Sequence, residues 1–176
     1  MHAVHLYSPQ TALTTAAVRA VQSWDKIFDI NVKAAALLAT EAVPLMQKND
    51  AGGVSVDKGK IVFISSIASH RMIEDLGVYS ISKSALTALG RCLANELAPQ
   101  DIRVNIVSPG IIATQFSAAL LESEEHAATL RRTTPRGRVG APDDIADAVA
   151  FLVSDDSRYV VGEELFVTGG LGRLRV

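Results

Sequence analysis

The feature that most constrains the fold is a short, unbroken apolar run followed by a long segment of helical periodicity. Residues 60–65 read Lys-Ile-Val-Phe-Ile-Ser and lie between turn signals, which is typical of a strand buried on both faces of a sheet. Apolar residues then recur at three and four positions over residues 79–97, and Pro99 follows as a helix stop. A second strand is predicted over residues 102–107. A strand, a crossover helix and a second strand form the unit from which parallel sheets are built.

The segments on either side continue this alternation. Helical spacing predicts a long amphipathic helix over residues 23–47. A short helix is expected around residues 118–130, and Pro142 opens another with acidic residues in its first turn. A last short strand is predicted over residues 164–168, ended by two glycines. Helices that alternate with strands give the fold class: α/β, with a doubly wound, Rossmann-like parallel sheet covered on both faces.

Composition and charge exclude several other classes of protein. The chain has 176 residues, 48% of them hydrophobic, and a formal net charge of -2, which fits one globular domain and excludes intrinsic disorder and a general nucleic-acid surface. No apolar run approaches the roughly 18 residues of a membrane span. The first ten residues show no secretory signal, and the single Cys92 allows no internal disulfide. We therefore expect an intracellular protein. The cytoplasm is the preferred location, and mitochondrial and peroxisomal locations are left open. With His2 and His5 alone at the terminus, we expect no metal site.

Polar side chains gather where the predicted strands end, which is where ligands bind in sheets of this type. Ser65 and Ser66 close the first strand, and Tyr79 and Lys83 lie one turn apart on the following helix. A neighbouring ammonium group favours the phenolate, so we expect Lys83 to lower the pKa of Tyr79 and make it a proton donor and acceptor. The alternative is a solvated surface pair, since a tyrosine and a lysine four residues apart occur by chance on many helices.

These residues resemble those of the short-chain dehydrogenases/reductases. The resemblance begins with Ile64-Ser-Ser66 and Tyr79-Ser-Ile-Ser-Lys83 and extends over about residues 24–170. It is further carried by Asp29-Ile-Asn31-Val, by Asn95 to Asn105, by Ser108-Pro-Gly-Ile-Ile-Ala-Thr114, by Arg138-Val-Gly-Ala-Pro-Asp-Asp-Ile-Ala146 and by Gly162 to Gly170. Within the family, these motifs are most similar to the NADPH-dependent carbonyl reductase and retinol dehydrogenase branch. The implied activity is the NAD(P)-dependent interconversion of an alcohol and a carbonyl by hydride transfer.

The resemblance also implies roles for single residues. Tyr79 would be the general acid/base, Lys83 would bind the nicotinamide ribose and depress the Tyr79 pKa, and Ser66 would hold the substrate oxygen. Asn31 would hold a water that joins Lys83 to solvent. The residues implied to line the nicotinamide are Pro109, Gly110, Ile112 and Thr114. The residues implied to contact a small hydrophobic carbonyl or alcohol substrate are Ser66, Phe116, Leu120 and Leu121.

Several of these residues have a purely structural alternative. Asn31 could bridge backbone groups inside its own helix, Thr114 could be an ordinary helix cap, and the lid leucines could be packing residues. His70 and Met72, which follow the first strand, could face a substrate or the surface.

The chain departs from the family pattern at its start. Its first glycine is Gly52, so no glycine-rich turn that could receive a cofactor pyrophosphate precedes the catalytic segment. The likeness to the carbonyl reductases favours NADP over NAD as the cofactor. We expect one partial short-chain dehydrogenase domain over residues 1–176, N-terminally truncated, with a divergent N-terminus over residues 1–22 and a substrate lid over residues 114–141.

A missing first half predicts an open sheet edge. The strand over residues 60–65 would lose a neighbour, and such an apolar edge invites pairing with another chain. We expect the chain alone to be unstable and oligomeric, or inactive, and its partners to be further copies or a full-length paralogue. Two hypotheses follow: an oxidoreductase, or a catalytically inactive short isoform that acts as an interaction subunit for full-length paralogues.

Overall fold

Three parallel strands form the centre of the molecule. The computed structural model describes residues 21–48, 57–71, 76–117 and 123–172. In it, β1 (Gly59–Ile64), β2 (Ile102–Pro109) and β3 (Glu164–Val167) form one sheet in the order β1-β2-β3. Gly59 lies opposite Ile102 and Ile64 opposite Val107. The α/β class with a parallel sheet is thereby confirmed, and the strand bounds differ from the predicted ones by one or two residues.

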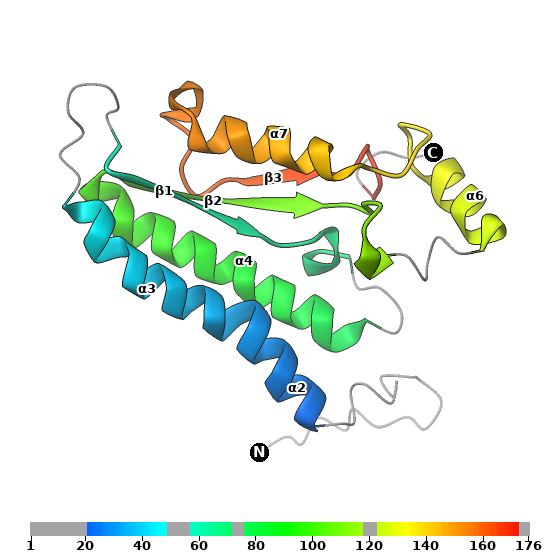
Figure 1. The fold of residues 1–176 in the computed structure, drawn as a ribbon, viewed down its shortest axis with the longest axis horizontal. Coiled ribbons are helices and arrows are strands. Elements are labelled where there is room, and N and C mark those ends of the chain that lie inside the picture. Colours follow the sequence, from blue (N-terminus) through cyan, green and yellow to red (C-terminus); the bar gives the residue numbers. More distant parts are fainter. Residues whose placement is uncertain (1–20, 49–56, 72–75, 118–122, 173–176) are drawn as a thin grey trace, which may run out of the picture.

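Helices cover both faces of this sheet, as the doubly wound prediction requires. On one face lie α3 (Ala34–Gln47) and α4 (Gly77–Leu97), and on the other lies α7 (Pro142–Val153) (Figure 1). The helix α2 (Val21–Phe28) continues into α3 through a π-helical turn over Asp29–Lys33. The long helix predicted over residues 23–47 is therefore present, with a π turn that its apolar periodicity did not reveal.

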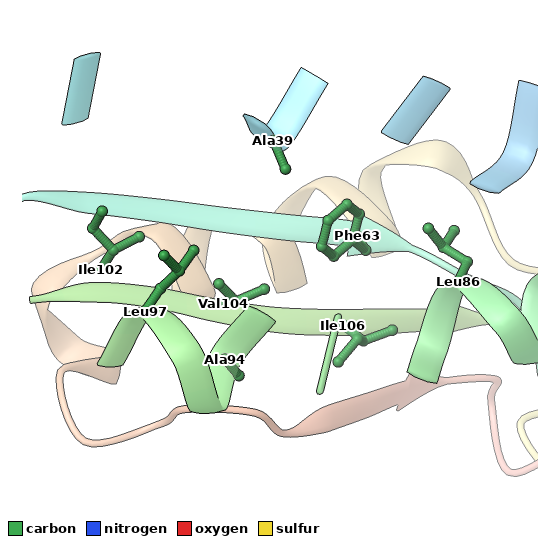
Figure 2. Packing of buried hydrophobic residues seen from close by; sticks show 8 residues of the cluster. All are labelled: Ala39, Phe63, Leu86, Ala94, Leu97, Ile102, Val104 and Ile106. Carbon is green, nitrogen blue, oxygen red and sulfur yellow. The ribbon is translucent and has the colours of Figure 1, made fainter. Parts of the chain in front are cut away.

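The main core lies between the sheet and the helices α3 and α4. Its buried members come from β1, β2, α3 and α4 and are Ala39, Phe63, Leu86, Ala94, Leu97, Ile102, Val104 and Ile106 (Figure 2). Gly90 marks the closest approach of α4 to the sheet, since a Cβ there would lie 2.8 Å from Ile106 Cγ1 and 3.1 Å from Phe63 Cδ2. This close packing fixes where α4 sits on the sheet, and hence where its first two turns lie.

The strand β1 is less buried than its sequence predicts. Phe63 is buried, but Ile64 is 42% exposed and the residues before Phe63 are half-buried. The reason is topological, because β1 pairs with β2 on one side and has no strand on its other side within the described ranges. The expectation of burial on both faces is wrong for this sheet, whereas the expected open apolar edge matches it.

The segment between β2 and α7 leaves the sheet at its carboxyl end. A short 3₁₀ helix spans Gln115–Ser117, and α6 (Glu124–Thr133) lies beyond the ends of the strands (Figure 1). The predicted helix around residues 118–130 overlaps α6, and residues 118–122 lie outside the described residues. So do residues 1–20, which make up most of the expected divergent N-terminus. Within the described ranges, no helix combines the length and the apolar character that crossing a bilayer needs.

Candidate functional site

The candidate site forms at the carboxyl end of β1, where the chain turns toward α4. Ser66 has an extended backbone and precedes a 3₁₀ turn over Ile67–Ser69, which it caps by accepting a hydrogen bond from the Ala68 N–H at 3.1 Å. Side chains from the first turns of α4 approach this turn. Two catalytic candidates from separate elements, Ser66 and Tyr79, are brought together here.

The Tyr79 side chain is hydrogen-bonded to Ser66 and half-buried. Burial raises the pKa of Tyr79 above its ordinary value of 10.0, while the Ser66 hydrogen bond acts in the opposite direction and is the smaller effect. The predicted net lowering of the Tyr79 pKa is therefore wrong for this structure. Burial of the phenol outweighs the interactions that would stabilise its anion.

Lys83 places its amine beneath the end of β1. Its Nζ donates a hydrogen bond to the Ile64 carbonyl at 2.9 Å and lies 5.7 Å from the centroid of the Tyr79 ring. Burial lowers the pKa of this amine from its ordinary value of 10.5. The pair is therefore not the solvated surface pair of the alternative interpretation, because both groups are partly buried at the end of the strand.

Asn31 reaches α4 from the π turn. Its side-chain Nδ2 donates to Ser82 Oγ at 3.0 Å, and Ser82 Oγ donates to the Tyr79 carbonyl at 2.7 Å. A π turn contains one more residue than the α-helical turn it replaces, which rotates the side chains that follow it. Asn31 thus bonds across to the helix that carries Tyr79, not within its own helix. Ser82 was missed as a site residue, although it lies inside the quoted Tyr79–Lys83 motif.

Further hydroxyl groups hold the turn after β1 against α4. Ser65 Oγ donates to the Lys83 carbonyl at 3.0 Å and lies 2.8 Å from Thr87 Oγ1. Ser69 Oγ donates to the Ser66 carbonyl at 2.6 Å, and Ser84 Oγ donates to the Ser69 carbonyl at 2.7 Å. These bonds fix the backbone on both sides of Ser66. The sequence shows the serines but not the partners that α4 gives them.

The turn after β2 carries the residues implied to line a nicotinamide. Gly110 N–H donates to the Val167 carbonyl at 3.0 Å, and a Cβ at Gly110 would lie 3.0 Å from Thr168 Cα, so Pro109 and Gly110 run close against the end of β3. Ile112 forms a parallel bridge with Gly140. The turn is thereby fixed to β3 on one side and to the segment before α7 on the other.

Thr114 is exposed at the end of this turn, directly before the 3₁₀ helix. Ser117 Oγ donates to the Ile112 carbonyl at 2.5 Å and accepts from the Thr114 N–H at 3.0 Å. The hydroxyl that ties the turn together is therefore that of Ser117, and the hydroxyl of the exposed Thr114 lies 3.5 Å from it. The expected substrate contacts Phe116, Leu120 and Leu121 cannot be placed, because the Phe116 side chain and residues 118–122 lie outside the described residues.

His70 turns away from the Ser66–Tyr79 pair. Its Nε2 lies 2.8 Å from Glu164 Oε2, and its ring packs edge-on against Phe166. Glu164 also accepts from Arg91 Nη2 at 3.1 Å and from Ser108 Oγ at 2.5 Å. The His70 side chain is therefore held in a polar cluster around Glu164 of β3, and Met72 lies outside the described residues. Within those residues, no group of three His, Cys, Asp or Glu could hold a metal ion.

The donors at the site fit one end of a dinucleotide cofactor. The Lys83 amine and the Tyr79 hydroxyl are the types of group that bind ribose hydroxyls, and the exposed Thr114 hydroxyl could bind a carboxamide. The tightly packed glycines of the described ranges instead approach other protein groups: Gly59 meets Met46, Gly90 meets Ile106 and Gly110 meets Thr168. The residues present therefore fit the nicotinamide end of the cofactor and supply no glycine cradle for its pyrophosphate.

Comparison with known proteins gives concordant matches. A family model described as Enoyl-(Acyl carrier protein) reductase matches residues 6–172. Dehydrogenase/reductase SDR family member 4 from Bos taurus is 44% identical over 147 residues, which are 84% of this chain and 50% of that protein. The chain spans about half the length of the curated relatives it matches.

Solved structures share the fold of this chain. Gluconate 5-dehydrogenase from Burkholderia cenocepacia, in complex with NADP and tartrate, matches with a TM-score of 0.80 and 28% identity over 89% of this chain and 58% of that chain. A 3-oxoacyl-[acyl-carrier protein] reductase from Brucella melitensis matches with a TM-score of 0.78 and 31% identity over 88% of this chain and 55% of that chain.

Proposed function

The chain belongs to the short-chain dehydrogenase/reductase family, and we propose on that premise that it carries the catalytic half of an NAD(P)-dependent oxidoreductase. The reaction is the interconversion of an alcohol and a carbonyl. The observation that supports this most is the hydrogen bond between the Tyr79 and Ser66 side chains, with the Lys83 amine close to the Tyr79 ring. Two hydroxyls and an ammonium at the end of a parallel strand can bind one carbonyl oxygen and exchange a proton with it.

Each residue has a distinct part in this proposal. Tyr79 gives its phenolic proton to the carbonyl oxygen during reduction and takes it back during oxidation. Ser66 Oγ donates a hydrogen bond to the same oxygen and stabilises its developing charge. Lys83, released from the Ile64 carbonyl, lies near enough to favour the Tyr79 anion that reduction leaves behind. Asn31 holds α4 through Ser82, one helical turn from Tyr79.

The proposed cofactor is NADP, with NAD as the alternative. Binding of NADP by the Burkholderia structure supports this choice. When bound, the nicotinamide supplies or accepts the hydride. Lys83 and Tyr79 would bind its ribose, and the turn formed by Pro109, Gly110 and Ile112, with Thr114 at its end, would line the ring. The described residues hold no pyrophosphate cradle, so tight binding needs groups beyond them.

The proposed substrate is a small hydrophobic alcohol or carbonyl. Its oxygen would bind Ser66 and Tyr79, and Phe116 with Leu120 in the lid (residues 114–141) would contact its apolar part. The 3-oxoacyl substrate class named for the Brucella relative combines a carbonyl with an apolar chain in the same way.

A test starts with the purified chain and NADPH. Titration calorimetry measures cofactor binding, and loss of NADPH absorbance measures reduction of a panel of apolar aldehydes and ketones. In Tyr79→Phe we expect turnover to fall by at least about 100-fold, because the proton donor is lost. Tyr159→Phe is the matched control, since Tyr159 is 99% exposed. Measurable turnover that is equal in Tyr79→Phe and Tyr159→Phe would show that the assigned role is wrong.

A second candidate function is an interaction subunit without turnover. It is favoured by the open edge of β1 and by exposed apolar side chains on the helical rod α2–α3, of which Leu38 is 72% and Leu45 68% exposed. Such a surface suits association with a full-length paralogue. A folded chain that binds no NADPH, but forms a defined complex with a full-length paralogue in light scattering, would support this candidate over the oxidoreductase.

A further inference from the structure

A cavity of about 210 Å³ opens beside the turn that follows β2. It lies between that turn, the end of β3 and the start of α7. Its lining residues are Ile111, Ile112, Arg136, Arg138, Gly140, Asp144, Val167, Thr168 and Gly169. None of these is Ser66, Tyr79 or Lys83. The cavity therefore differs from the hydroxyl cluster, although Ile112 belongs to the turn proposed to line the nicotinamide.

One part of the cavity wall is apolar and firmly held. Ile111, Ile112 and Val167 supply it. The Gly140 N–H donates to the Ile111 carbonyl at 3.0 Å and the Ala113 N–H to the Gly140 carbonyl at 2.9 Å, so the two sides of the wall are hydrogen-bonded together. A side chain at residue 140 would overlap Ile112 Cδ1. A bound molecule with a short hydrocarbon part would contact this wall without a change in the backbone.

The opposite part of the wall has an excess of positive charge. Arg138 forms a two-pronged ion pair with Asp144, with both N···O distances 2.7 Å, and these two charges compensate each other. Arg136 adds a second guanidinium. Its backbone N–H donates to the Gly169 carbonyl at 3.0 Å, which fixes the residue on the wall. Arg136 is exposed and its charge also acts on Asp144, but across the part of the chain that the structure describes its side chain makes no hydrogen bond or salt bridge.

A neutral donor lies on the same wall. Thr168 lies at the end of β3 and lines the cavity, and in the described ranges its hydroxyl, which stays accessible to solvent, has no hydrogen-bond partner. A hydroxyl without a protein partner is available to donate to a bound molecule. A guanidinium without a hydrogen-bond partner, an available hydroxyl and an apolar wall around one cavity form a combination that recognises an oxyanion joined to a hydrocarbon group.

We propose that this cavity binds a small organic oxyanion, a carboxylate or a phosphate ester with a short apolar part. The Arg136 guanidinium pairs with two oxygens of the anion, the Thr168 hydroxyl donates to one of them, and the hydrocarbon part packs on Ile111, Ile112 and Val167. Arg138 stays paired with Asp144, so it forms part of the cavity wall and does not pair with the anion. The proposal does not depend on hydride transfer, because no residue of the proton-transfer cluster takes part.

The test is a set of NMR titrations of the complete 176-residue chain with three probes. Butyrate carries a carboxylate on an apolar chain, inorganic phosphate carries the other oxyanion, and 1-butanol is the neutral counterpart of butyrate. We expect millimolar binding of at least one oxyanion, with shifts at residues of the cavity, and at least about tenfold weaker binding of 1-butanol. Added salt should weaken the binding of the anion and leave 1-butanol unaffected.

Three variants test which charged side chain binds the oxyanion. Arg136→Ala should weaken oxyanion binding about tenfold, whereas Arg132→Ala, which removes the same charge from an exposed position on α6, should leave it unchanged. Asp144→Asn should tighten binding, because it removes the carboxylate that competes for Arg138. If circular dichroism shows that Arg136→Ala is unfolded, Arg136→Gln replaces it. Asp144→Asn remains a separate test, because it should strengthen oxyanion binding where the arginine variants weaken it.

The relative affinities for the two probes distinguish a carboxylate ligand from a phosphate ester ligand. Tighter binding of butyrate than of phosphate identifies a carboxylate site, and the reverse order identifies a phosphate ester site. The proposal is overturned by the absence of oxyanion binding, by equal binding of butyrate and 1-butanol, or by equal effects of Arg136→Ala and Arg132→Ala. Loss of NADPH turnover in Tyr79→Phe with unchanged butyrate binding would show that the two sites are independent.

Discussion

Arg103 is a charged residue in the centre of the sheet, and its removal should destabilise the chain strongly. It lies on β2 with its side chain 4% exposed. Its Nε donates to Asp57 Oδ2 at 2.6 Å. Its two terminal nitrogens donate to the carbonyls of Leu152, Ser154 and Val160 and to Ser157 Oγ, at 3.0 to 3.3 Å. One guanidinium therefore joins β2 to the end of α7 and to the segment before β1.

The cost of Arg103→Ala follows from what the substitution leaves behind. It removes the main cation beside the Asp57 carboxylate, which is 9% exposed. It also leaves the carbonyls of Leu152 and Ser154 without the guanidinium, with Ser157 Oγ as their remaining side-chain donor. Breaking a buried ion pair by removing one partner costs about 3–5 kcal/mol. Single domains are stable by about 5–15 kcal/mol, so a large part of the total would be lost. In a chain of this length the melting temperature should fall by about 6–20 °C.

The assay is urea unfolding followed by circular dichroism, on wild type and three variants. Arg103→Lys keeps the charge but cannot reach all these acceptors, so it should fall between wild type and Arg103→Ala. Arg158→Ala is the matched control: Arg158 is exposed and donates to the Asp155 carbonyl at 3.0 Å, so the change should cost about 0.5 kcal/mol or less. A loss for Arg103→Ala within about 1 kcal/mol of the control would refute this reasoning.

Three further predictions concern packing and protonation. Gly90→Ala should destabilise the fold, because the new Cβ would lie 2.8 Å from Ile106 Cγ1. The overpacking costs about 1–3 kcal/mol and outweighs a helix-propensity gain of about 1 kcal/mol. Chemical unfolding checks this, and a variant more stable than wild type would contradict it. The folded-state pKa of Tyr79 is raised above its ordinary 10.0, so the folded state loses stability as the pH rises past that value. Ultraviolet difference titration of wild type against Tyr79→Phe should show the Tyr79 phenolate forming only above pH 10, and its formation at lower pH would be the opposite result. Arg138 holds the pKa of Asp144 well below its usual 3.8, so its stabilising effect is present above that pH and is lost as the pH falls below it. Asp144→Asn should therefore be less stable than wild type at neutral pH, with a difference that shrinks in acid, and a difference independent of pH would argue against the ion pair.

The sequence by itself determined the elements and their order. Apolar periodicity locates α4 and α7, and the β-branched run before Ser65 locates β1, because these patterns reflect contacts between residues a few positions apart. The spacing of Tyr79 and Lys83 on one helical face, with serines at the preceding strand end, indicated where the candidate site lies. Each of these signals is local, which is why the chain alone carries it.

Only the tertiary structure decided which side chains meet. The Asn31–Ser82 bond depends on a π turn and on the packing of two helices, the Lys83 amine bonds the Ile64 carbonyl, and burial reverses the predicted direction of the Tyr79 pKa. Arg103 sits in a strand pattern that gives no sign of its partners, about fifty residues away in sequence. Such contacts join residues far apart in the chain. Their energies depend on burial and on distances of a few tenths of an ångström, which only the packed fold determines.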